Sequence, residues 1–336
     1  MKKTGRKPLN ISMAGILAGL IVLVLVIILP FVLSEFLVFL LTEILILGLF
    51  GLSVNLLVGH SGMVTFGHGA FYGVGAYTVG ILLIKTETPF AIAMLLSPLF
   101  AAVFGLVVGV FCIRLTKFYF AMLTLAFGML IWAVIYKWEG LTGADNGLVG
   151  AIIPELISSP QSFFYFTFGV VLLCASILWR VIHSPFGLAM KAIRENSEKF
   201  RFLGMNLTIH KLAAFVISAA FAGVSGGLYT AFTRGTFPDF ASWVKSGDAL
   251  VIALIGGVGS FWGPCIGAAV LLLLQQIVTS VFEYWNLVLG IILILLVLFL
   301  PEGVMGAFKR LWDLQNVVPH GRRNEGHVTE VSANRD

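Results

Sequence analysis

The residues best suited to chemistry lie in one glycine-rich stretch, GLSVNLLVGHSGMVTFGHGAFYGVGAYTVG, from Gly51 to Gly80. Backbone that is irregular at membrane depth is tolerated only against protein or a water-filled cavity. The stretch therefore predicts either a broken helix beside a translocation path or close helix packing through small residues. If it lines a path, the residues that would form or gate that path are Asn55, Ser61, Gly62, Thr65, Gly67, His68, Phe71, Gly73, Gly75 and Tyr77.

The same stretch permits an enzymatic interpretation. GHSG, from Gly59 to Gly62, fits the GxSG pattern of rhomboid-like intramembrane serine proteases. A general base must lie roughly 3 Å from the serine, whereas His68 would lie about 10 Å from Ser61 along a continuous helix. Proteolysis is therefore a distant alternative.

Glu43 is the acidic residue that falls well inside a predicted span, toward its outer end. An ionisable group within the membrane is by default a candidate functional residue. A proton-coupled carrier would bury several charged residues, and the sequence offers no second candidate near the midplane. We expect Glu43 to face an aqueous vestibule or a polar partner.

The composition indicates that these residues belong to a chain embedded in a membrane. Hydrophobic residues make up 59% of the chain and charged residues 11%, and the mean hydropathy is +1.02. A soluble domain does not need so much apolar surface. The three cysteines lie in apolar segments without CxxC spacing, so they predict neither a metal site nor disulfides.

The apolar runs predict an all-α integral membrane bundle of about ten helices, each roughly 20 residues long. Residues 11–301 form the transmembrane domain, between terminal segments 1–10 and 302–336. The stretch from Asp248 to Phe282 is split in two because GGVGSFWGP interrupts it. The predicted spans are Ile11–Leu33, Phe36–Leu57, Phe66–Ile84, Pro89–Ile113, Phe118–Tyr136, Phe163–Val181, Leu212–Phe232, two spans within Asp248–Phe282, and Trp285–Leu300.

The basic residues predict the orientation. With both termini in the cytoplasm, the 21 Lys and Arg side chains concentrate inside, as the positive-inside rule requires. The exceptions, which this arrangement leaves outside, are Lys85, Lys137, Arg234 and Lys245. The net charge of +5 therefore reports orientation, and nucleic acid is not expected as a partner.

Two segments predicted outside the membrane are long enough to have a function of their own. Residues 137–161 form an external loop that contains Thr142, Gly143, Asp145, Asn146 and Gly147. Residues 183–211 form a cytoplasmic loop in which SPFG turns the chain into a helix from Leu188 to Arg194. A second short helix, Glu198–Leu203, would present Phe200 and Leu203 on one side and end at Gly204. Such a helix suits a partner's groove or the lipid surface.

Several blocks together resemble one family, the branched-chain amino acid importer permeases of the LivM type. They occur in family order between Leu52 and Pro301 and are SVNLLVGHSGMVTFGHGAFYGVGAYTVG, FYFAMLTLAF, LTGADNGL, SPFGLAMKAIRENSEKFRFLGMN and ALIGGVGSFWGPCIGA. The resemblance implies a coupling segment for an ATPase formed by Glu195, Asn196, Ser197, Glu198, Phe200, Leu203 and Gly204. Lys199 and Phe200 replace the small residues often found there.

The resemblance also implies an assembly in the bacterial inner membrane. Its members are a second, LivH-type permease, two cytoplasmic ATPases and an external substrate-binding protein. This chain has no GxxxxGK[ST] phosphate loop, so ATP and Mg would be bound by the ATPase partners, and no cofactor is expected in this chain. Permeases for urea or short-chain amides are similar, and a stand-alone secondary carrier remains an alternative.

Overall fold

The computed structural model describes residues 30–86, 88–115 and 117–281, together with 287–288, 290–291, 294 and 303–306. The predicted first span, Ile11–Leu33, lies almost wholly outside these residues. Residues 1–10, most of the predicted last span Trp285–Leu300 and most of segment 302–336 also lie outside them. The total of ten spans and the position of the termini stay predictions.

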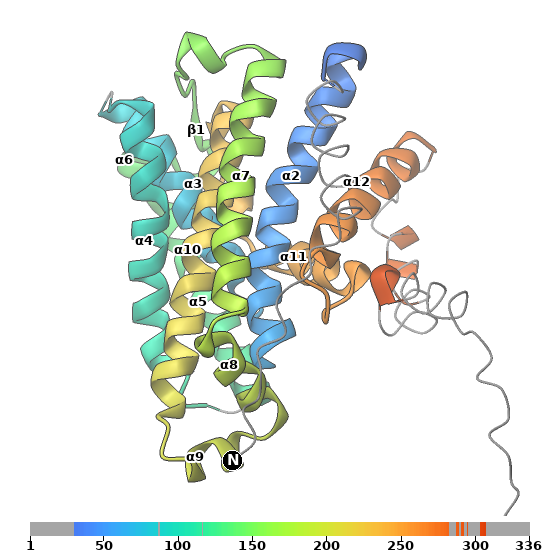
Figure 1. Cartoon of the computed structure of the whole chain (residues 1–336). Helices are drawn as coiled ribbons and strands as arrows, with labels where there is room; N and C mark the ends of the chain where they lie inside the picture. The colour runs from blue at the N-terminus through green and yellow to red at the C-terminus, as the bar shows by residue number, and fades with distance from the viewer. Residues whose placement is uncertain are drawn as a thin grey trace, which may run out of the picture.

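Long apolar helices form the body of the molecule (Figure 1). Within the described residues, five helical segments are long and apolar enough to cross a membrane, and each matches a predicted span. They are α2 (Glu35–Asn55) with its π-helical extension η1 (Leu56–Ser61), α4 (Phe90–Cys112), α5 (Lys117–Lys137), α7 (Pro160–Ile182) and α10 (Leu207–Thr233). The chain is thus a multi-pass helical membrane protein.

Helix α3 (His68–Lys85) lies inside this bundle and packs most extensively against α10 and α4. Its glycines allow that approach, because a Cβ on Gly75 would overlap the backbone of Gly223 in α10. The aromatic rings of Phe50, Phe71 and Phe215 are completely buried beside it and form the centre of the core. Residues 62–67 before α3 are not helical, so the break predicted in the glycine-rich stretch is confirmed.

The chain after α10 also contains a non-helical passage. Strand β2 (Gly235–Thr236) and the 3₁₀ turn η4 (Pro238–Ala241) run along α3, where Ala241 lies against Gly73. Helix α11 (Trp243–Gly256) follows, and its 14 residues span only about 21 Å. The predicted break is confirmed, because the chain leaves the helical path at Gly257, with φ +104°, and α12 occupies Gly263–Val281.

The two ends of the bundle carry different structures (Figure 1). At one end, β1 (Leu148–Val149) pairs antiparallel with β2, an exception to the predicted all-α fold. At the opposite end, α8 (Pro185–Glu195) and α9 (Ser197–Phe202) project from the bundle. The short elements beside β1 are α6 (Glu139–Thr142), η2 (Ala144–Asn146) and η3 (Glu155–Ile157).

Candidate functional site

The projecting arm formed by α8 and α9 is built by local capping. Asn196 separates the two helices, and its Oδ1 accepts hydrogen bonds from the N–H groups of Glu198 and Lys199 at 3.1 and 3.0 Å. This is the usual N-cap arrangement, which satisfies otherwise unpaired donors of the first turn. After α9, Gly204 takes the left-handed conformation with φ +76°. The predicted pair of helices and the glycine stop are therefore confirmed.

The apolar side chains of α9 point in two directions, contrary to the prediction. Phe200 is 2% exposed and packs with Ile193 and Leu207 in a small core under the arm. Leu203 is 74% exposed and Phe202 is 89% exposed. The prediction that Phe200 and Leu203 share one side is wrong, because Phe200 anchors the arm to α8 and α10. The outward apolar tip is formed by Phe202 and Leu203, and the sequence interpretation missed Phe202.

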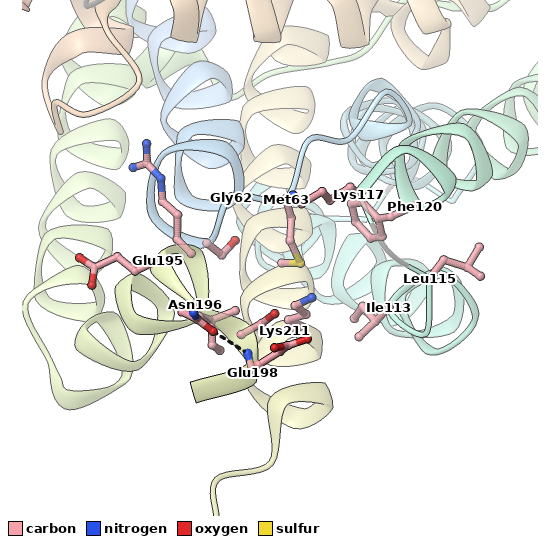
Figure 2. A pocket seen from close by; sticks show the side chains of 14 residues that line it. Gly62, Met63, Ile113, Leu115, Lys117, Phe120, Glu195, Asn196, Glu198 and Lys211 are labelled. Carbon is pink, nitrogen blue, oxygen red and sulfur yellow. Dashed lines mark hydrogen bonds between the residues drawn. The ribbon is translucent and has the colours of Figure 1, made fainter. Parts of the chain in front are cut away.

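A cleft of 540 Å³ lies between the arm and the end of the bundle. Figure 2 shows Asn196, Glu198 and Lys211 gathered on one side of it, while Glu195 points away from them. The opposite wall comes from the segment after η1, including Met63, and from the start of α5, including Lys117 (Figure 2). Of the predicted coupling residues, the cleft brings together Glu195, Asn196, Ser197 and Glu198, whereas Phe200, Leu203 and Gly204 are not among its lining residues.

One hydrogen bond connects the arm to η1, and a second connects the end of α2, next to η1, to the break between α11 and α12. The guanidinium of Arg194, in the last turn of α8, donates to the backbone oxygen of Gly59 in η1. One turn earlier in the chain, the amide Nδ2 of Asn55 donates to the backbone oxygen of Ser260 at 2.9 Å. Ser260 belongs to the break between α11 and α12. The arm, η1 and the break between α11 and α12 are therefore joined by consecutive contacts.

The residues predicted to line a path are mostly buried within this chain. Asn55, Ser61, Thr65, His68, Phe71 and Tyr77 are all less than 5% exposed. A Cβ on Gly67 would overlap the backbone of Thr124, and Gly73 and Gly75 contact neighbouring elements equally closely. Gly62 is exposed and lines the arm cleft together with Ser61. The glycines of this stretch thus allow close packing, and a role of these residues in forming or gating a path stays a prediction.

The hydrogen bonds of this stretch do not form a protease site. Ser61 Oγ donates to the backbone oxygen of Leu57 at 2.7 Å. His68 Nε2 instead lies 3.2 Å from Ser53 Oγ and 3.1 Å from Ser218 Oγ. Within the described residues, no histidine nitrogen lies within hydrogen-bond distance of Ser61 Oγ. The nucleophile and base that proteolysis requires are therefore not brought together.

The predicted external loop forms a compact turn at the β1 end. Thr142 is buried, and its hydroxyl donates to the backbone oxygens of Ile135 and Trp138 at 2.6 and 2.7 Å. Gly143 and Gly147 both have positive φ angles, +76° and +66°, and each would collide with backbone if it carried a Cβ. Asp145 and Asn146 are exposed at the tip between them. The loop thus presents a carboxylate and an amide on a rigid frame.

Charged side chains at the start of α11 lie beside the central helices. The Lys245 side chain is 17% exposed, and the hydroxyl of its neighbour Ser246 accepts a hydrogen bond from the Gly69 N–H at 2.7 Å. The location of Lys245 outside the membrane stays a prediction. Lys245 Nζ lies 3.8 Å from Asp248 Oδ2. Glu43 has the polar partner that was expected, since the Tyr229 hydroxyl donates to Glu43 Oε1 at 3.1 Å. The spacing of Lys245 and Asp248 on one helical face was the missed signal.

Comparison with known sequences places the chain among transport proteins. Residues 36–297 match the family described as "Branched-chain amino acid transport system / permease component". The chain is 29% identical over 328 residues to the high-affinity branched-chain amino acid transport system permease protein LivM of Escherichia coli, with 90% of this chain and 77% of the relative covered. It is 26% identical over 282 residues to the corresponding LivH protein of Salmonella typhimurium, with 77% and 90% covered. No solved structure gives a significant match.

Proposed function

The chain belongs to the permease-component family of branched-chain amino acid transport systems, and we propose that it forms half of the membrane pathway of an ATP-driven importer for leucine, isoleucine and valine. A second permease of the LivH kind would supply the other half. Two cytoplasmic ATPases would bind ATP and Mg, and an external binding protein would deliver the substrate. The complex would lie in a bacterial inner membrane, with ten spans and both termini of this chain in the cytoplasm.

The connection from Arg194 to Gly59 carries this proposal. An ATPase can act on a permease only if its movement reaches the membrane helices. The arm offers an exposed apolar tip, Phe202 and Leu203, that suits a groove on a partner. Arg194 then ties the arm to η1, and Asn55 ties η1 to the break before α12. Closure of the ATPases would move the arm and rearrange these breaks, which amounts to alternating access.

Charge placement supports the proposed orientation. The segment from Arg180 to Lys211, which contains the arm, is rich in Lys and Arg, whereas residues 138–159 at the β1 end contain none. Basic loops are retained in the cytoplasm. In this orientation the ATPases would meet the arm, and the binding protein would meet Asp145 and Asn146.

Copurification and reconstitution test the function directly. An affinity tag on this chain should recover a second permease and the ATPases, and Phe202→Glu should reduce ATPase recovery because it places a charge in an apolar contact. In proteoliposomes, the complete complex should take up leucine only with the binding protein outside and ATP on the ATPase side. The exposed residue Lys199, changed to Glu, is the matched control on the same helix. Full recovery of the ATPases with Phe202→Glu would contradict the proposed docking face.

The charged residues in the bundle favour one competing function, a stand-alone secondary carrier, because such carriers bury paired ionisable groups. Uptake measurements in proteoliposomes distinguish the secondary carrier from the ATP-driven importer. Uptake by this chain alone, driven by an ion gradient and without ATP, would support the carrier and overturn the importer.

A further inference from the structure

A cluster of charged and polar side chains joins α2, α10 and α11. Glu43 stands about 12 Å along α2 from Glu35, by the helical rise of 1.5 Å per residue. Tyr229 contributes from α10, and Lys245 and Asp248 contribute from the first turns of α11. Ionisable residues at such positions are costly and mark pathways for substrates or ions.

The charges are arranged so that one acid and one base remain separate. Lys245 Nζ lies 5.3 Å from the centre of the Tyr229 ring and 5.8 Å from that of Tyr72, over aromatic faces that stabilise a cation. Glu43 is hydrogen-bonded to the Tyr229 hydroxyl. Within the described part of the chain, no Lys or Arg forms an ion pair with Glu43. The phenol of Tyr229 therefore stands between a carboxylate and an ammonium group.

Glu43 borders an open space with further polar lining, whereas Tyr229, Lys245 and Asp248 are not among the residues that line it. A cleft of 300 Å³ between α2 and α12 is lined by Glu43 and by Gln275, Gln276 and Thr279 of α12. Its size is at the lower limit of ligand pockets, about 300–1,000 Å³. The Tyr72 hydroxyl, on the side of Lys245, is fully buried and has no hydrogen-bond partner among the described residues. Such an orphaned donor calls for a ligand or water to satisfy it.

We propose that Glu43 and Lys245 guide a zwitterionic amino acid through the membrane: Glu43 accepts the α-ammonium group, and Lys245, exchanging its bond with Asp248, binds the α-carboxylate. This role rests on the proposed import function and specifies its substrate class. A neutral amide such as urea carries no charges for these two groups to recognise. The contact is brief, because Asp248 competes for Lys245 and Tyr229 competes for Glu43.

An experiment must distinguish this substrate-binding role from a purely structural role of the same residues. The Glu43–Tyr229 and Lys245–Asp248 contacts could simply hold α2, α10 and α11 together. Glu43→Gln separates the two roles, since the amide oxygen can still accept the Tyr229 hydrogen bond while the charge is lost. Lys245→Met keeps the length of the side chain and removes its charge. Glu43→Asp and Lys245→Arg restore the charges, and Glu35→Gln, on the exposed start of the same helix, is the control.

The measurements are leucine uptake and ATP hydrolysis stimulated by the binding protein, both in proteoliposomes with the complete complex. Loss of a hydrogen bond to a charged group should lower uptake by about tenfold in Glu43→Gln and Lys245→Met. Stimulated ATP hydrolysis and thermal unfolding should stay near wild type, and the charge-restoring variants should recover uptake. Undiminished leucine uptake in both neutral variants would overturn this role alone. A parallel fall in uptake and ATP hydrolysis would also overturn it, in favour of the structural role. A wild-type complex that carried urea but not leucine would overturn the proposed substrate as well.

Discussion

At the scale of single residues, glycine determines how closely the central helices approach. α3 and α10 meet at Gly75 and Gly223, where a Cβ on either residue would overlap atoms of a neighbouring helix. In membranes such small-residue contacts replace the hydrophobic effect as the reason for helix association. The stability of the bundle thus depends on the absence of a Cβ atom at individual glycines.

Gly75→Ala should therefore destabilise the protein. The added methyl group would overlap backbone of α10, and overpacking of this kind costs typically 1–3 kcal/mol. Thermal unfolding in detergent should show a lower Tm than wild type. Gly169→Ala in α7 is the matched control, because a Cβ there meets nothing within 4 Å. Equal Tm values for the two variants would show that the close approach of α3 and α10 carries little energy.

At the scale of elements, the sequence predicted the helices better than their connections. Runs of apolar residues located α2, α4, α5, α7 and α10, since a bilayer imposes a length that the composition reveals. The helix stop at Gly204 was also predicted, because its role is local, whereas the N-cap role of Asn196 was not. The contacts of Lys245 were not predicted, since the packing of β2 and η4 along α3 is a tertiary arrangement that leaves no periodic pattern in the sequence. Phe200 was assigned to the wrong face because a helix of six residues is too short for a reliable pattern.

Under the proposed mechanism the arm and η1 move together, because Arg194 joins them through its hydrogen bond to Gly59. Arg194 is therefore the residue to change. Arg194→Ala removes the hydrogen bond to the Gly59 oxygen, and a bond from a charged donor is typically worth 1.5–3 kcal/mol. We expect transport per ATP hydrolysed to fall by about tenfold, because a coupling energy of 1.4 kcal/mol corresponds to that factor. Uptake and ATP hydrolysis, measured together in proteoliposomes, give this ratio. Lys191→Ala, an exposed change on the same helix, should leave it unaltered. An unchanged ratio in Arg194→Ala would remove this contact from the coupling route.

At the scale of the whole molecule, the bundle has two structurally distinct ends. The arm cleft and the outward side chains of Phe202 and Leu203 lie at one end, and the rigid turn with Asp145 and Asn146 lies at the other (Figure 1). Between them, the broken stretches before α3 and after α11 are joined to the arm through η1. Under the proposed function, these contacts are the route by which a push on the arm would reach the interior of the bundle.

This division requires the two ends to lie on opposite sides of the membrane, and cysteine labelling can test it. Asp145 and Glu198 are both exposed, so Asp145→Cys and Glu198→Cys should each react readily once a reagent reaches them. In cells with an intact inner membrane and an outer membrane made permeable to small molecules, a membrane-impermeant maleimide should label Asp145→Cys but not Glu198→Cys. Glu198→Cys should require permeabilised membranes, because the proposed orientation places the basic arm in the cytoplasm. Cys112 and Cys174 are buried and Cys265 is half-buried, so a variant with all three changed to Ala provides the background. Labelling of Glu198→Cys from outside would place the arm beyond the reach of any cytoplasmic ATPase, and the coupling route through Arg194 would have nothing to drive it.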